Sequence, residues 1–145
     1  MMMRPVKSFG LCLAAAGLSL MASIQVLSQD DTPKEIKTKK NPVTASDTVQ
    51  SKAKSNYEEK CLMCHGETGK GDGPMAGMLK EKPPDMTDGK ILSEMTDGDV
   101  YWLVTKGKKP MPPFENQLSD DERWGLVHLM RTLSNTKSNI KPKKN

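Results

Sequence analysis

The chain has 145 residues, which is room for one domain with tails at its ends. Only 35% of the residues are hydrophobic, and the aromatic residues are two Trp, two Tyr and two Phe. Because a small domain buries a small share of its surface, we expect a bound group to help fill its interior. The formal net charge is +4. No basic helix face or aromatic interleaving accompanies it, which argues against nucleic-acid binding.

Residues 1–28 have the order of a secretory signal. Arg4 and Lys7 precede an apolar run, and small and polar residues follow that run. We expect cleavage after Ser28 and a periplasmic or otherwise exported protein. The alternative is an uncleaved N-terminal anchor and possible membrane association, because Phe9 to Leu27 approaches the length that spans a bilayer.

Two segments of low hydrophobicity flank the expected domain. Residues 29–46 are rich in Lys, Thr, Asp and Pro, which predicts a flexible linker because so few apolar groups cannot offset the entropy of ordering. Residues 135–145 have the same character and carry unopposed lysines, so we expect a basic, disordered tail. The folded domain is therefore predicted to span residues 47–134.

Three helices are predicted in chain order. The first has one face that recurs at steps of four and three residues, formed by Val49, Ala53, Tyr57, Cys61 and Cys64. The second lies between an N-cap at Thr96 or Asp97 and Gly107 just past its end. The third begins with Ser119 and Glu122, spaced as a capping box, and runs to about Leu133. No useful length of sequence alternates as a strand would, so the predicted class is all-α.

The segment between the first two helices, Gly66 to Gly89, is rich in Gly, Pro and Asp and is predicted to be a loop. It is long for so small a domain, and a cofactor for it to wrap would account for the length. Gly66, Gly71 and Gly73 are expected to let the backbone pass close to that cofactor, although ordinary turn chemistry explains them almost as well.

The sequence Cys61-Leu62-Met63-Cys64-His65 is the attachment signature of c-type haem. Two thiols at this spacing on a helical turn can each add to one vinyl group of the haem. The next residue then brings an imidazole under the iron. We therefore predict covalent attachment through Cys61 and Cys64, with His65 as the proximal iron ligand.

Three other interpretations of the two cysteines compete with haem attachment. A thiol redox site would use the same pair, but no strand precedes Cys61 as a thioredoxin-like context requires. A zinc site needs four ligands, and only His128 or a carboxylate is left to complete the set. A disulfide between Cys61 and Cys64 would close a loop too small to add much stability. Haem attachment is favoured over all three.

Residues 47–134 resemble a small class I c-type cytochrome domain of the bacterial monohaem type. The attachment motif closes the first helix, GETGKGDGP follows it, KPPDMTDG lies midway, and GKKPMPPFENQLSDDERWGLVHLMRTL ends the domain. The resemblance implies three main helices wrapped around one covalent haem c. It also implies that a methionine in the proline-flanked loop, Met111, is the sixth iron ligand. Tyr57 and Trp124 are expected to pair where the first and last helices cross.

Met111 has rivals for the place of sixth ligand. All of them follow the attachment motif in the chain: Met75, Met78, Met86, Met95, Met130 and His128. Methionine is usually core filler. Met111 differs because it lies between Pro110 and Pro112, which restrict its backbone. His128 is expected to be a structural histidine that packs against the first helix.

An iron with both an imidazole and a thioether bound has no open site, so the expected function is outer-sphere transfer of single electrons and not catalysis. The expected partners are a redox donor and a redox acceptor among exported or membrane proteins. Lys106, Lys108 and Lys109 adjoin Met111 and are candidates to attract an acidic partner, although a simple solvated cluster explains them equally well.

Two alternatives to a free electron shuttle stay open. One is a haem c subunit fixed in a larger membrane or periplasmic oxidoreductase complex. The other is an enzyme or gas sensor in which Met111 does not bind and the iron stays open. The sequence predicts no oligomeric state and no particular redox partner.

Overall fold

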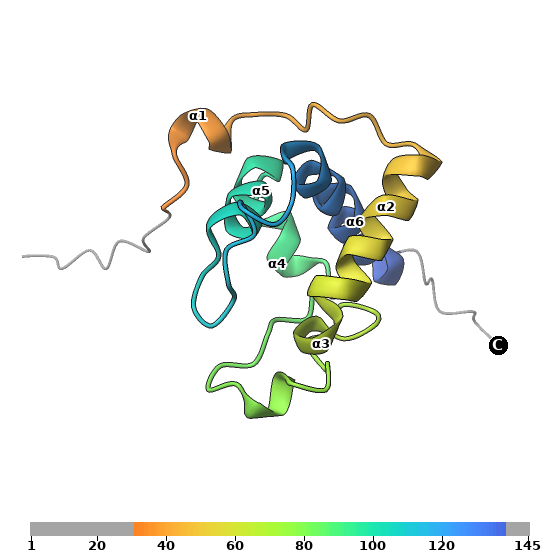
Figure 1. The fold of residues 1–145 in the computed structure, drawn as a ribbon, viewed down its shortest axis with the longest axis vertical. Coiled ribbons are helices and arrows are strands. Elements are labelled where there is room, and N and C mark those ends of the chain that lie inside the picture. Colours follow the sequence, from red (N-terminus) through yellow and green to blue (C-terminus); the bar gives the residue numbers. More distant parts are fainter. Residues whose placement is uncertain (1–30, 139–145) are drawn as a thin grey trace, which may run out of the picture. The chain divides into compact units, whose positions relative to one another are not determined.

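The computed structural model describes residues 31–138 of the chain (Figure 1). This part contains six α-helices and one short 3₁₀ helix, joined by loops. In order they are α1 (Lys34–Lys37), α2 (Asp47–Lys60), α3 (Leu62–His65), the 3₁₀ helix η1 (Ala76–Met78), α4 (Lys90–Ser93), α5 (Asp97–Lys106) and α6 (Asp120–Ser138). Within these residues there is no strand, and the one β-type pairing is an isolated bridge between Lys108 and Met111. The predicted all-α class with three main helices, α2, α5 and α6, is confirmed.

The predicted leader, residues 1–28, lies outside the described residues. Among those that are described, no helix is both long and apolar enough to cross a bilayer.

Capping side chains fix the start of α5 at Thr96, one of its two predicted N-caps, and the start of α6 at the predicted Ser119–Glu122 capping box. The Thr96 hydroxyl accepts the Asp99 N–H at 3.1 Å, and the Asp99 carboxylate accepts the Thr96 N–H at 2.8 Å. Ser119 and Glu122 make the same reciprocal pair at the start of α6, at 3.3 and 2.9 Å. Each pair satisfies two backbone N–H groups that would otherwise lack a partner.

α6 continues to Ser138 and so enters the segment predicted as a disordered tail, residues 135–145. Residues 135–138 are helical instead. Once a helix has nucleated, each added residue gains a hydrogen bond at little further cost, which composition alone does not register. Residues 139–145 lie outside the described part of the chain.

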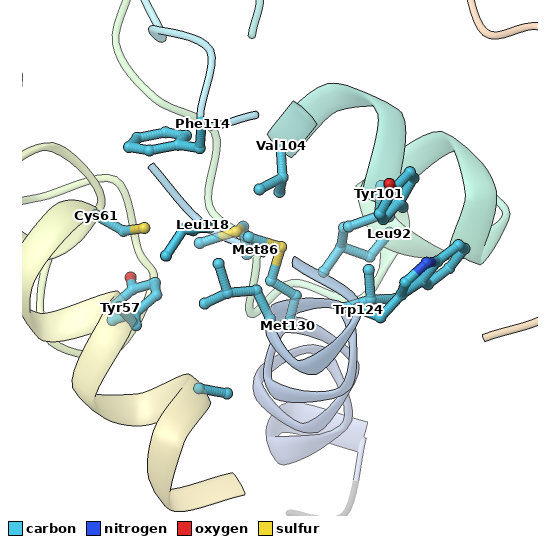
Figure 2. Packing of buried hydrophobic residues seen from close by; sticks show 14 residues of the cluster. Tyr57, Cys61, Met86, Leu92, Tyr101, Val104, Phe114, Leu118, Trp124 and Met130 are labelled. Atoms are coloured by element: carbon cyan, nitrogen blue, oxygen red, sulfur yellow. The ribbon is translucent and has the colours of Figure 1, made fainter. Parts of the chain in front are cut away.

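α2 and α6 cross at Gly125, where a Cβ atom would lie 3.4 Å from Val49 and 3.7 Å from Ala53. Trp124, 1% exposed, is next to this crossing and stacks on Tyr101 of α5, with ring centroids 4.2 Å apart. Tyr57 lies at the other end of the core cluster (Figure 2), and its hydroxyl donates to the Gly66 carbonyl at 2.8 Å. The expected pairing of Tyr57 with Trp124 is therefore wrong: the helices cross one turn before Tyr57, and Trp124 faces α5.

Residues 31–46, which we call the strap, fall within the segment predicted as a flexible linker, residues 29–46, but they pack on the helical unit. Ile36 and Val43 contact the core cluster. A Cβ on Gly98 of α5 would lie 1.8 Å from the Ile36 carbonyl oxygen, so α1 rests directly on the α5 backbone.

Hydrogen bonds attach the strap to α6 as well. The Asn41 side chain donates to the Trp124 carbonyl at 2.9 Å, and Nε2 of His128 lies 2.6 Å from the Val43 carbonyl oxygen. The strap was predicted to be flexible because its composition is polar. It is ordered instead, because a few hydrogen bonds and the side chains of Ile36 and Val43 hold it on the helices.

Candidate functional site

The attachment motif begins where α2 ends and forms one further helical turn. Cys61 separates α2 from α3, and its N–H still donates to the Tyr57 carbonyl at 2.8 Å. The Cys61 carbonyl then accepts the N–H groups of Cys64 at 3.1 Å and His65 at 2.9 Å. This turn fixes the two thiols and the imidazole relative to one another.

A cavity of about 340 Å³ adjoins this turn. Cys61, Cys64, His65 and Met111, the four residues predicted to hold a cofactor, all line it. The cavity brings together residues 61–65 of the α2–α3 junction and the loop before α6. Its apolar walls come mainly from α4, α5, α6 and the loop that precedes α6: Leu92, Val100, Leu103, Val104, Phe114 and Met130.

His65 fits the role of a metal ligand. Burial lowers the pKa of its imidazole below the usual value, so the ring is neutral at pH 7 and has a lone pair to donate. The buried Nδ1 atom has no hydrogen-bond partner among the described residues. Buried side-chain nitrogens are normally hydrogen-bonded, so this ring is not committed to a structural role.

The environment of Cys61 argues against a thiol redox site. Cys61 is 7% exposed, and Figure 2 shows its sulfur directed toward the interior of the cluster. Burial, and to a smaller extent the nearby Cys64, raise the pKa of the Cys61 thiol to about 11. Reactive redox cysteines have a lowered pKa and a thiolate near neutral pH, which is the opposite arrangement.

The zinc interpretation lacks a ligand set in residues 31–138, where no group of three or more His, Cys, Asp or Glu side chains is placed to hold a metal ion. His128, the possible fourth ligand, does not line the cavity and contacts the strap carbonyl of Val43. Both thiols are free and not joined to each other. A neutral imidazole, thioethers and two thiols in an apolar cavity instead suit the iron and vinyl groups of a haem.

Met111 is held by a tight turn of the proline-flanked loop. The N–H of Met111 donates to the Lys108 carbonyl at 2.8 Å, and the N–H of Lys108 donates to the Met111 carbonyl at 3.1 Å. A Cβ on Gly107 would lie 2.6 Å from the Met111 carbonyl oxygen, so the chain folds back here at a spacing that only glycine permits. The turn places Met111, half-buried, on the cavity wall.

The structure divides the rival ligands into two groups. Met75 and Met78 are 39% and 73% exposed and do not line the cavity. Three other methionines do line it, namely Met86, Met95 and Met130. Of these, Met86 and Met130 belong to the buried core and Met95 packs against it.

Of the two explanations offered for Gly66, Gly71 and Gly73, the structure favours tight packing of turns over passage of the backbone close to the cofactor. None of them lines the cavity. A Cβ on Gly71 would lie 2.1 Å from the Pro83 carbonyl oxygen, and one on Gly73 would lie 2.4 Å from the Met63 carbonyl oxygen. These glycines therefore let the long loop fold closely on itself and on the attachment turn.

Sequence reasoning missed one wall of the cavity, formed by residues 91–95. Ile91, Leu92 and Met95 line it, although the segment falls outside the predicted helices. A weak local signal was available, because the Asp88 carboxylate accepts the N–H of Lys90 at 2.9 Å at the start of α4.

The fold and the site define the class of this chain, a class I c-type cytochrome. The chain belongs to the family described as cytochrome c oxidase, cbb3-type, subunit III, whose model matches residues 49–130. No curated protein matches the chain significantly.

Two solved structures are similar. One is the reducing HAO-like protein complex Kustc0457/Kustc0458 of Kuenenia stuttgartiensis, with 39% identity and a TM-score of 0.57 over 63% of this chain. The chain spans only 46% of the length of that structure's chain. The other is the KustC0563 c-type cytochrome, with 22% identity and a TM-score of 0.50 over 56% of this chain and 95% of that one, a likeness of fold.

Proposed function

We propose that this protein is a monohaem cytochrome c that carries single electrons between redox partners and is not itself an enzyme. The observation that carries the proposal is the convergence of Cys61, Cys64, His65 and Met111 on one apolar cavity. The family to which the chain belongs supports it.

Cys61 and Cys64 would hold the haem by thioether bonds, and His65 and Met111 would bind its iron. The bound haem supplies an iron that alternates between the ferric and ferrous states. The chain's own contribution is to keep the His65 imidazole neutral, to present the Met111 thioether on a constrained turn, and to exclude water with apolar walls. If His65 and Met111 both bind the iron, no site would be left for a substrate.

Lysines at the cavity support an acidic redox partner. Lys108 and Lys109 are exposed and line the cavity, together with Lys60, Lys82 and one acid, Glu81. Lys106, the third lysine of the sequence cluster, pairs with Glu115 and lies over the Trp102 ring. Net positive charge around the cavity favours fast encounter with an acidic surface, so electron transfer should slow as ionic strength rises.

Export, either free after cleavage near Ser28 or anchored through residues 1–28, is part of the proposal. It is supported by the order of charged, apolar and small residues in the leader.

A second candidate is a haem subunit fixed in a larger oxidoreductase complex. Two observations favour it: the family is described as an oxidase subunit, and one similar structure is a protein complex. Copurification of this chain with stable partners at high salt would support a subunit. Recovery of a free, coloured protein of monomer size would support a shuttle.

The decisive experiment is expression of the full chain in cells that attach haem c. The proposal predicts a coloured product whose haem stays on the chain in a denaturing gel, with one haem per chain by mass. The double variant Cys61→Ser with Cys64→Ser should lose the stain, whereas His128→Ala should keep it. A colourless wild-type product would overturn the proposal. Rapid carbon monoxide binding to the reduced protein would point to an open iron and hence to the sensor or enzyme alternative.

A further inference from the structure

Arg131 of α6 binds three groups on the segment that joins α4 to α5. Its Nε atom donates to the Asp97 carboxylate at 2.8 Å, and Nη2 donates to the Met95 carbonyl at 2.7 Å. Nη1 donates to the Leu92 carbonyl. All three guanidinium nitrogens are therefore engaged, and the rigid planar fork fixes the three acceptors relative to α6.

The two carbonyls that Arg131 binds belong to the missed wall of the cavity, residues 91–95. The side chains of Leu92 and Met95 line the cavity, and Leu92 is 4% exposed. α4 has only four residues, far fewer than a helix needs for stability of its own. Its last carbonyls have no partner within the helix, and Arg131 supplies one for Leu92.

We infer that Arg131 is a positioning residue for electron transfer, which holds residues 91–95 closed as a wall of the cofactor cavity. The inference rests on the proposed function. Met130, the neighbour of Arg131 in α6, also lines the cavity. Two consecutive residues of α6 therefore contribute to the cavity, Met130 as part of its wall and Arg131 by binding the segment 91–95. Burial is one of the factors that set a haem potential. A loosened wall admits water, which favours the more highly charged ferric state and lowers the potential.

Arg123, on the same helix, provides a matched control. It is also an arginine with several partners: its guanidinium contacts Tyr101, Glu115, Leu118 and Asp120. None of these four residues lines the cavity. Losing Arg123 removes the same charge from α6 and costs stability, but leaves the contacts of the wall in place.

The test compares Arg131→Ala, Arg131→Lys and Arg123→Ala in the haem-loaded full chain. Two quantities are measured, the amide hydrogen exchange of residues 91–96 and the midpoint potential. For Arg131→Ala we expect exchange of the wall to accelerate about tenfold, equivalent to about 1.4 kcal/mol, and the potential to fall. Arg131→Lys keeps the charge but cannot bind all three groups, so it should show the same changes to a smaller extent. Arg123→Ala should unfold at a lower temperature with a potential close to that of the wild type.

Unchanged exchange and potential in Arg131→Ala would overturn the inference, as would an equal fall in potential in Arg123→Ala. Full recovery of the potential in Arg131→Lys while exchange stays fast would also overturn it, because charge and not position would then set the potential. If Arg131→Ala fails to fold, Arg131→Lys carries the test. A wild-type chain without haem would instead overturn the proposed function.

Discussion

Met111 is one of four methionines that line the cavity, and a thioether alone does not distinguish them. What distinguishes Met111 is its backbone, closed by two hydrogen bonds to Lys108 and flanked by prolines. Met86 and Met130 are 5% and 6% exposed and serve as core. For an iron ligand, a fixed backbone position matters more than the degree to which the side chain is buried.

Replacing Met111 by Ala is expected to lower the midpoint potential and to let the reduced protein bind carbon monoxide, because it would remove one of the two ligands proposed for the iron. Visible spectroscopy with and without carbon monoxide, together with potentiometry, measures both effects. Met95→Ala removes a thioether from the same cavity and should leave carbon monoxide excluded. If instead Met95→Ala opens the iron and Met111→Ala does not, the ligand assignment is reversed.

The sequence identified residues that line the cavity better than it identified the residues that support the cavity. A five-residue motif and a methionine between prolines identify four lining residues, because their chemistry is local. The roles of Gly71, Tyr57 and Arg131 depend on contacts with Pro83, Gly66 and the wall segment. No periodicity encodes such contacts between distant segments.

At the scale of elements, the starts of α5 and α6 could be predicted from the sequence, and the order of the strap could not. The N-cap Thr96 and the Ser119–Glu122 pair act within a single helical turn, so local sequence is sufficient to predict them, although the part of Asp99 in the α5 cap was not predicted. The strap is held by Asn41, Val43 and Ile36 against α5 and α6. Tertiary contacts order the strap, and amino-acid composition does not predict such contacts.

The effect of Gly98→Ala on the free energy of unfolding distinguishes a docked strap from a free linker, because the two arrangements predict opposite signs. In an isolated helix this change stabilises by about 1 kcal/mol. Here the added Cβ would lie 1.8 Å from the Ile36 carbonyl oxygen, so the strap must move and we expect net destabilisation. Chemical denaturation measures it. Gly77→Ala, which meets nothing within 4 Å, is the control and should be neutral or stabilising. A more stable Gly98→Ala variant would contradict the docked strap.

The start of α6 gives a prediction for pH. The Ser119 N–H, with smaller contributions from Asn56 and Lys52, lowers the pKa of Glu122 from 4.5 to about 2. A lowered folded-state pKa means that Glu122 stabilises the protein fully above pH 4.5, and that this stabilisation is lost as the pH falls toward 2.

Glu122→Gln should therefore cost about 1 kcal/mol at pH 7, and the difference from the wild type should shrink between pH 4.5 and 2. Denaturation curves at several pH values measure the difference. Asp121→Asn makes the same charge change on an exposed neighbour and should cost less. A difference between wild type and Glu122→Gln that stays constant with pH would exclude the carboxylate as its source.

At the scale of the whole helical unit, the cavity is large relative to the core that surrounds it. The cavity has a volume of about 340 Å³, and apolar side chains of three helices line it. Without an occupant these side chains lack packing partners on one side and lose the free energy of burial, about 25 cal/mol per Å² of apolar surface. A cofactor is thus part of the interior, as the low aromatic content suggests.

Preventing haem attachment is consequently expected to leave the chain far less stable. The variant with both Cys61 and Cys64 replaced by Ser, made in the same cells, should show less helix by circular dichroism and a broad transition at a lower temperature. The haem-loaded wild type is the reference. Equal transition temperatures for the two proteins would show that the core is complete without the cofactor.

The docked strap also has a mechanical consequence. Along the chain, the strap first contacts α5, where the Ile36 carbonyl lies against Gly98, and then α6, through Asn41 and Val43. A force applied at the start of the strap would therefore reach α5 and α6 through these contacts. Both helices line the cavity, so such a force would act on the cavity walls.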